Sequence, residues 1–202
     1  MRKQNRGEGI SAINKFFWAL IGLMLTVVGT FVEVFVVLPE GGNMKVASLG
    51  ITYQLAGVFF TGMLAGKNAA AAAQIAYVIM GLFKLPIFFL GGSFDYLQYP
   101  SFGYILGFIP GAWLCGFLAI PGKRRLELFA LSAFCGLLVV HACGILYLVG
   151  YTCVTPLLGN QLSDSYLWDA IRLYTITPFA SQLALICAVS LVAFVIRLIL
   201  LY

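Results

Sequence analysis

The chain has 202 residues, of which 62% are hydrophobic and only 9% are charged. Soluble globular domains carry roughly 25% charged residues, so this composition excludes a soluble domain of any size. The net charge of +5 does not indicate a nucleic-acid partner, because the basic residues flank apolar stretches rather than forming a patch. The composition therefore predicts an integral membrane protein.

Six apolar stretches are each long enough to cross roughly 30 Å of hydrocarbon. They predict an all-α integral membrane protein, a single domain over 1–202 built as a six-transmembrane-helix bundle. The expected spans are 16–38, 47–65, 68–90, 101–120, 126–150 and 176–202. The connections are short except for 151–175, which is expected either to cap a cavity or to form a long solvated loop.

The positive charges predict the orientation in the membrane. An even number of spans places both termini on one side, and Lys and Arg concentrate on the cytoplasmic side of membrane proteins. With the termini in the cytoplasm, only Lys45, Lys84 and Arg172 lie at the outer side. The inner side then holds Arg2, Lys3, Arg6, Lys15, Lys67, Lys123, Arg124, Arg125 and Arg197. We expect a multi-pass protein of the cell membrane, prokaryotic in origin, with both termini cytoplasmic.

Small residues at four-residue spacing predict where helices approach closely. Such stripes occur at Gly103, Gly107 and Gly111, at Gly62 and Gly66, and at Gly22, Thr26 and Thr30. They either pack helices within the bundle or dock a partner subunit.

The chain offers little for catalysis. His141 is the single histidine, with no carboxylate within a helical turn, and is interpreted as a hydrogen-bonded packing residue. No protease or hydrolase motif and no P-loop is present, and the five cysteines form no CxxC pair. The sequence therefore predicts neither an enzyme nor a metal or cofactor site.

The stretch 81–104 is the strongest candidate for a ligand site. Pro86 ends or kinks a helix, and Gly91 and Gly92 allow backbone that other residues do not. Asp95 and Tyr104 then place polar and aromatic groups beside this irregular segment, which near membrane depth must be covered or line a cavity.

Two ionisable residues, Glu33 and Lys84, lie near the outer ends of their expected spans. They either snorkel to the interface or line an outward cavity. In the second case Lys84 would meet an anionic ligand.

Over about 52–116, the chain resembles the BioY family, the substrate-binding (S) component of energy-coupling factor (ECF) biotin transporters. The matching positions keep their order and spacing. They are Thr52, Gln54, Gly57, Gly66, Tyr77, Gly81, Leu85, Pro86, Phe88, Gly91, Gly92, Pro100, Gly103, Tyr104, Gly107 and Phe108.

This resemblance implies a lipid-embedded six-helix bundle that captures biotin as its ligand. It also implies that the chain pairs with a transmembrane coupling subunit and two cytoplasmic ATPases, which supply the energy for uptake. The residues that it carries over as lining of the vitamin pocket are Gln54, Gly91, Gly92 and Tyr104. An amide such as Gln54 can bond a ureido group.

The last span departs from the family pattern. The family follows Pro-Phe with a Gly-Asp and then a Lys that contact biotin, whereas Pro178 and Phe179 are followed here by uncharged residues. Ser181 or Gln182 can bond the ligand without charge, or Asp169, Arg172 or Lys84 can supply a charge from elsewhere. Either biotin is held differently, or the substrate is another small vitamin-like molecule.

The family's coupling motif, Ala-x-x-x-Ala in the first span, is replaced by Gly22 and Thr26. These two residues are the candidates for docking the coupling subunit. A membrane scaffold that transports nothing stays a further alternative.

Overall fold

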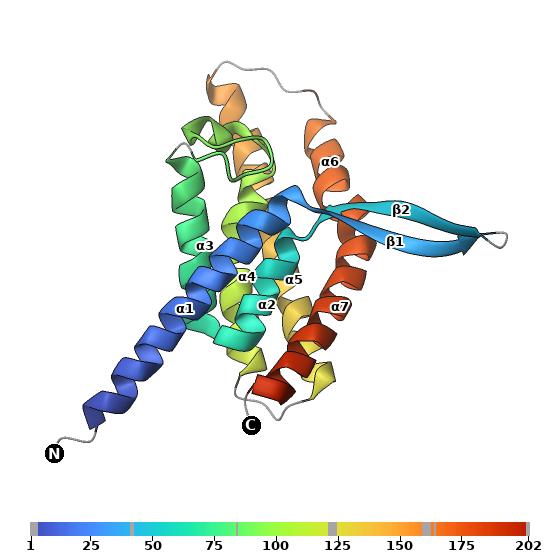
Figure 1. Cartoon of the computed structure of the whole chain (residues 1–202). Coiled ribbons are helices and arrows are strands. Elements are labelled where there is room, and N and C mark those ends of the chain that lie inside the picture. The colour runs from blue at the N-terminus through green and yellow to red at the C-terminus, as the bar shows by residue number, and fades with distance from the viewer. Residues whose placement is uncertain are drawn as a thin grey trace.

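Helices make up most of the computed structural model, which describes residues 4–40, 43–83, 85–120, 125–158, 163 and 165–200. Lys84 and Asp164 lie outside the described residues. The long helices are α1 (Gln4–Phe31), α4 (Phe102–Ala119), α5 (Leu126–Val154) and α7 (Thr177–Leu200), and the shorter ones are α2 (Gln54–Ala65), α3 (Lys67–Leu82) and α6 (Tyr166–Ile171). They run as a bundle with both termini at one end (Figure 1).

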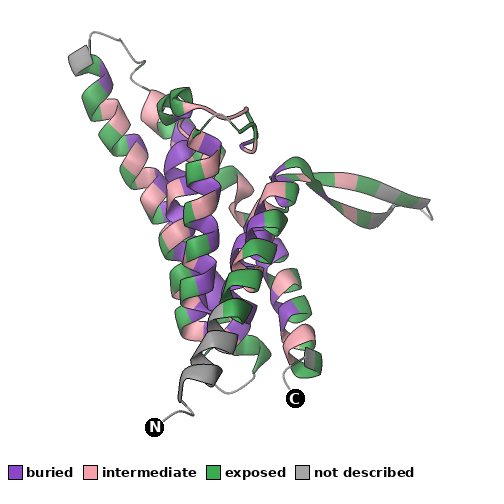
Figure 2. Cartoon of the chain, turned by 60° about the vertical axis from the view of Figure 1, so that its left-hand side comes forward, coloured by how far each residue is buried: buried purple, intermediate pink, exposed green. Residues whose placement is uncertain are grey.

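Four stretches in the described part of the chain are long and apolar enough to cross a membrane: Ile13–Phe31, Phe102–Ala119, Leu126–Val154 and Tyr166–Ile199. The last is continuous because a π-helical turn, η3 (Arg172–Ile176), joins α6 to α7. The buried residues face the interior between helices (Figure 2). Large apolar side chains such as Leu146 and Ile199, each 71% exposed, face outward, as expected for a surface solvated by lipid.

The expected first and second spans are corrected by a β-hairpin. Strand β1 (Glu33–Glu40) pairs antiparallel with β2 (Asn43–Thr52), so the first helix ends at Phe31 and α2 begins only at Gln54. The cause is the β-branched run of Val34, Val36 and Val37, which favours extended backbone. The hairpin projects from the bundle past α7 (Figure 1), so the fold is not purely α-helical.

The third expected span is also too long. Helix α3 ends at Leu82, and the chain then turns so that Phe88 and Gly91 exchange backbone hydrogen bonds of 3.1 and 3.0 Å. With 12 and 16 residues, α2 and α3 measure about 18 and 24 Å, less than the roughly 30 Å of hydrocarbon.

The glycine stripe of α4 packs against α5. A Cβ added to Gly107 would lie 2.9 Å from the Val140 backbone, and one on Gly111 would lie 2.9 Å from the Gly136 carbonyl oxygen. Gly62 of α2 approaches the Ala112 carbonyl in the same way, at 3.0 Å. These stripes serve packing within the bundle, which resolves the alternative that the sequence left open for them.

Gly22 and Thr26 lie on the face of α1 that packs inside the chain. A Cβ on Gly22 would meet the Thr61 side chain at 2.3 Å. Thr26 is fully buried, donates to the Gly22 carbonyl at 2.9 Å and accepts from Gln74 at 3.1 Å. In this conformation a partner subunit has no access to either residue, so coupling would need another surface.

The end of the bundle that holds the termini is basic. Arg197 of α7 donates to the carbonyls of Ala119 and Ile120 at 2.9 and 3.3 Å. Lys67, at the turn between α2 and α3, lies over the rings of Trp113 and Phe117. Lys15 and Arg125 lie toward the same end, on the N-terminal half of α1 and at the start of α5.

Candidate functional site

A cavity of about 470 Å³ lies at the end of the bundle away from the termini. Each of its described lining residues is uncharged, and the lining combines aromatic and aliphatic side chains with two amides and several hydroxyls. The lining residues are Gly50, Ile51, Thr52, Gln54, Leu55, Phe89, Leu90, Tyr96, Ser101, Tyr104, Ile105, Phe108, Val140, His141, Leu173, Tyr174, Pro178 and Gln182. They come from the β2–α2 junction, the loop after α3, helices α4 and α5, the π-helical turn η3, and α7.

Gln54 begins α2 and forms one polar wall of the cavity. Its Nε2 donates to the Tyr77 hydroxyl at 2.8 Å, and that hydroxyl donates to the Ile87 carbonyl at 3.0 Å. Tyr77 is fully buried and its hydroxyl is also 3.0 Å from that of Thr30. The network ties Gln54 to α1, α3 and the following loop, so its amide is held before any ligand arrives.

A second wall is formed by α4, α5, η3 and α7. His141 Nε2 lies 2.8 Å from Gln182 Oε1, and the Tyr104 hydroxyl lies 2.8 Å from that of Thr175. The Tyr104 ring meets His141 edge-on at 5.8 Å between centroids and tilts against Tyr174 at 5.9 Å. These contacts order a polar and aromatic surface that suits a flat ring system.

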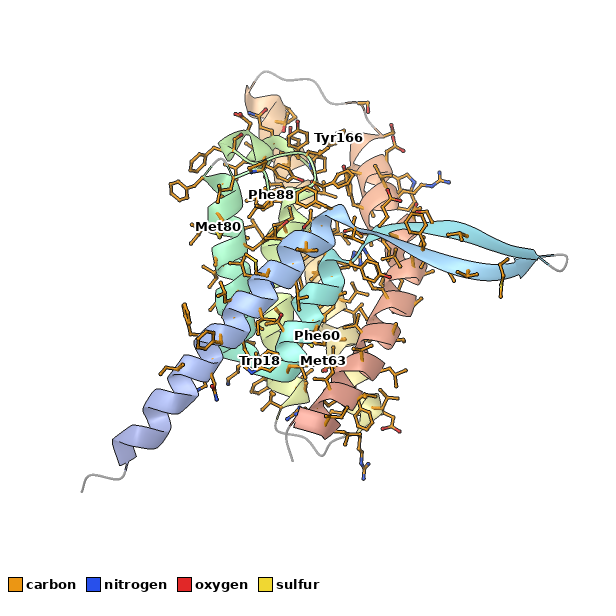
Figure 3. The ribbon with its side chains drawn as sticks, in the orientation of Figure 1. Trp18, Phe60, Met63, Met80, Phe88 and Tyr166 are labelled. Atoms are coloured by element: carbon orange, nitrogen blue, oxygen red, sulfur yellow. The ribbon has the colours of Figure 1, made fainter. Side chains whose placement is uncertain are left out.

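The loop between α3 and α4 covers one side of the cavity and is anchored by Phe88. This ring is fully buried, lies 5.3 Å from Tyr77 and 4.7 Å from Tyr96, and occupies the end away from the termini (Figure 3). Gly81 leaves room for it, because a Cβ there would lie 2.1 Å from the ring.

Two loop glycines act through the backbone rather than as cavity lining. Gly91 has a φ of 106°, a conformation that side chains disfavour. A Cβ on Gly92 would lie 1.8 Å from the Leu85 carbonyl oxygen. The glycines therefore let the loop fold back so that Phe89 and Leu90 reach the cavity.

Gly92→Ala is expected to displace this loop. The added Cβ would clash with backbone atoms, which cannot rotate away as a side chain can. We therefore expect the free energy of unfolding to fall by about 2 kcal/mol or more. The measurement is the melting temperature in detergent. Gly150→Ala in α5 is the control, because a Cβ there has nothing within 4 Å and should keep or raise that temperature. Equal melting of the two variants would contradict this role.

Several residues that the sequence suggested for the ligand site lie outside the lining of the cavity. Asp95 is exposed and is held within the loop by Ser93, whose hydroxyl donates to its carboxylate at 2.9 Å. Asp169 and Arg172 are exposed, although the adjacent Leu173 and Tyr174 do line the cavity. Ser181 is half-buried and outside the cavity lining. Of the expected polar side chains, the structure brings together Gln54, Tyr104 and Gln182.

Sequence reasoning missed His141 and Tyr77 as parts of the site. His141 is hydrogen-bonded, as interpreted, but it also lines the cavity. Its partner Gln182 is 41 residues away, so no local pattern marks the pair. Tyr77 stands behind Gln54 rather than in the cavity lining, and the only signal for it was its place in the family match.

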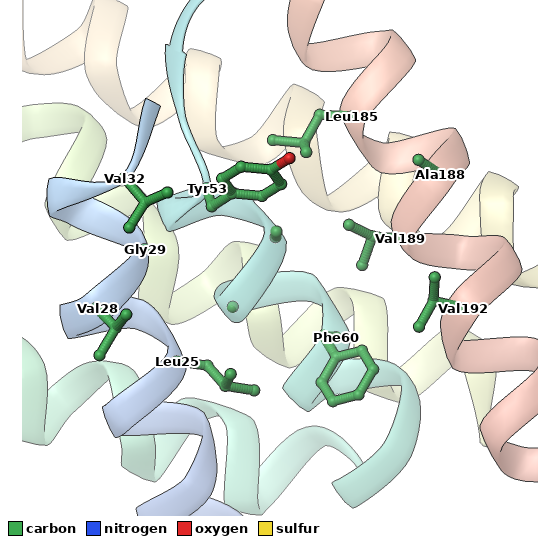
Figure 4. Close-up of a pocket in the computed structure, with 12 residues that line it drawn as sticks. Leu25, Val28, Gly29, Val32, Tyr53, Phe60, Leu185, Ala188, Val189 and Val192 are labelled. Atoms are coloured by element: carbon green, nitrogen blue, oxygen red, sulfur yellow. The ribbon is translucent and has the colours of Figure 1, made fainter. Parts of the chain in front are cut away.

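A second recess, of about 410 Å³, opens between α1, α2 and α7 (Figure 4). Its walls are apolar side chains such as Leu25, Phe60 and Val189, and Tyr53 supplies the only side-chain polar group among the described lining residues. Such a surface cannot fix the orientation of a polar ligand. The polar cavity is therefore the candidate ligand site.

Comparison with known proteins shows the family to which the chain belongs. The family model described as "BioY family" matches residues 1–200. The chain belongs to the BioY family. The earlier resemblance over 52–116 is thus confirmed and extends across the whole bundle.

Curated relatives of this BioY chain include two named for biotin transport. The "Probable biotin transporter BioY" of Lysinibacillus sphaericus is 30% identical over 71% of this chain and 68% of its own length. The "Biotin transporter BioY" of Thermotoga maritima is 32% identical over 54% of this chain and 64% of its own length. An uncharacterized 21.2 kDa protein of Cyanophora paradoxa is 31% identical over 91% of this chain and 94% of its own length.

The fold has a counterpart among solved structures. The crystal structure of the S-component for biotin from an ECF-type ABC transporter covers 98% of this chain and 95% of its own, with a TM-score of 0.62 and 17% identity. The chain therefore shares the fold of this S-component.

Proposed function

We propose that this chain is the substrate-binding membrane subunit of a biotin uptake system and that biotin binds in the polar cavity. The observation that carries the proposal is the pair of held amides, Gln54 and Gln182, that line the same aromatic-rich cavity. Biotin combines a cyclic urea, which amides can bond, with apolar parts that suit the aromatic walls. The volume of about 470 Å³ falls within the roughly 300–1,000 Å³ of small-molecule sites.

The proposed orientation places the cavity outward and both termini in the cytoplasm. It is supported by the basic residues Lys15, Lys67, Arg125 and Arg197, which share one end of the bundle with the termini, and by the preference of Lys and Arg for the cytoplasmic side. Biotin would thus enter from the side opposite the termini.

Energy for uptake would come from separate subunits. The sequence contains no P-loop, and the ECF type of the structural counterpart supports a transmembrane coupling subunit with cytoplasmic ATPases. In this scheme the chain itself only binds biotin and presents it across the membrane.

Isothermal titration of the purified chain tests the proposal. We expect one biotin to bind per chain with a dissociation constant in the nanomolar range, which corresponds to a binding free energy of about −12 kcal/mol. Biotin should also raise the melting temperature of the chain. Absence of heat and of thermal stabilisation would reject biotin as the ligand.

A second candidate is a related small vitamin of neutral character. It is favoured by the uncharged lining of the described cavity, which offers no ion pair to the carboxylate that biotin carries. A thermal-shift screen across water-soluble vitamins separates the two, because the true ligand should give the largest shift.

A further inference from the structure

The two glutamines of the cavity are each tied to a protein partner on one side of the amide. A glutamine amide carries one accepting oxygen and two N–H donors. The group that is bonded to the protein partner is turned toward that partner, so the other group of the amide is turned away from it and has no protein partner. The hydrogen-bond network can therefore decide which polarity each glutamine offers to the cavity.

Gln54 is held so that it offers its oxygen. The Ile87 carbonyl can only accept, so Tyr77 donates its single hydroxyl hydrogen to it at 3.0 Å. The neighbouring Thr30 hydroxyl donates its own hydrogen to the Thr26 carbonyl at 2.8 Å. It therefore has no hydrogen to donate to Tyr77 and could only accept from it. Tyr77 must accept from Gln54, at 2.8 Å through Nε2. The Oε1 atom of Gln54 is left as an acceptor for the ligand.

Gln182 is held in the opposite sense. Its Oε1 lies 2.8 Å from His141 Nε2, while the buried Nδ1 of His141 has no hydrogen-bond partner among the described residues. A proton on Nδ1 would be a buried donor without an acceptor, which is costly, so the proton sits on Nε2 and is donated to Gln182. The two N–H groups of Gln182 are left for the ligand.

We propose that the site is polarised, with an acceptor at Gln54 on α2 and donors at Gln182 on α7. Tyr77 and His141 are the positioning residues that fix this polarity. Resting on the proposed function, the inference names the ligand group: a neutral cyclic urea or lactam whose N–H faces Gln54 and whose carbonyl faces Gln182. The two glutamines would recognise the head group of the ligand by hydrogen bonds alone, because no charged side chain is present among the described lining residues.

A matched pair of ligands and variants tests this polarity. In 2-iminobiotin, a protonated nitrogen replaces the urea carbonyl oxygen, so an acceptor becomes a donor and the head group gains a positive charge. The wild-type chain should prefer biotin. Gln182→Glu keeps the shape but offers only acceptors, so the ratio of the two dissociation constants should move toward 2-iminobiotin by about tenfold or more.

The positioning residues give a second, separable readout. Tyr77→Phe frees Gln54, which faces an N–H in both ligands, so both should weaken by about the same factor and the ratio should stay. His141→Phe frees Gln182 to rotate, so the preference between the two ligands should shrink. Because His141→Phe introduces no charge, this comparison separates hydrogen-bond polarity from the attraction between the carboxylate introduced by Gln182→Glu and the positive charge of 2-iminobiotin. It also decides between the outcomes if Gln182→Glu does not fold.

The outcomes separate the two proposals. Binding of neither ligand by the wild-type chain would overturn the biotin function, and the polarity with it. Biotin binding by the wild-type chain, with a ratio unmoved by Gln182→Glu or, if that variant is unfolded, by His141→Phe, would overturn the polarity alone.

Discussion

Tyr104→Ala is expected to weaken ligand binding by about 2 kcal/mol, or roughly thirtyfold. The Tyr104 ring is 8% exposed and fills the space above Gly144, where an added Cβ would lie 2.4 Å from the ring. Its removal takes away the aromatic surface between His141 and Tyr174. The measurement is the biotin dissociation constant of the folded variant, from isothermal titration.

Two variants control this result. Tyr104→Phe keeps the ring and removes only the hydroxyl shared with Thr175, so its loss should stay below about tenfold. Tyr151→Ala removes a tyrosine of α5 outside the cavity lining and should bind biotin as the parent does. A Tyr104→Ala variant that also binds like the parent would place the ligand elsewhere.

Gly107→Leu is expected to destroy the packing of α4 on α5 and to cost at least about 3 kcal/mol of stability. The contact that excludes a side chain is with backbone, since an added Cβ would lie 2.9 Å from Val140 Cα and carbonyl oxygen. Backbone cannot rotate away, so the two helices must separate. Tyr104 and His141 sit on these helices, and ligand binding should be lost together with the fold.

The same substitution at Gly150 is the matched control for Gly107→Leu. Gly150 is exposed near the end of α5, and nothing lies within 4 Å of an added Cβ. Size-exclusion profiles and melting temperatures in detergent should show a folded Gly150→Leu and an aggregated or early-melting Gly107→Leu. A Gly107→Leu chain with the same melting temperature as the parent would contradict the close packing of α4 on α5 at Gly107.

Hydropathy was enough to predict the membrane class and the approximate places of the later helices, because apolar length and charge deficit report directly on lipid exposure. It could not predict the hairpin. Residues 33–52 are about as apolar as the preceding helix, and apolar runs near a helix end read as its continuation. The β-branched cluster Val34, Val36 and Val37 was the signal that separated the two.

Site residues that belong to a local sequence motif could be predicted, whereas those that depend on contacts between distant parts of the chain could not. Gln54 and Tyr104 came from the family match, and Gln182 came from the segment that departs from it. His141 depends on its contact with Gln182, and Tyr77 depends on contacts with Gln54, Thr30 and Ile87. These contacts join five helices and a loop, so only the packed bundle reveals them.

A structure of the chain determined with biotin tests the central claim most directly. We expect ligand density in the polar cavity, with the urea between Gln54 and Gln182 and the ring beside Tyr104. Density in the apolar recess between α1, α2 and α7, or a polar cavity that stays empty at saturating biotin, would contradict it.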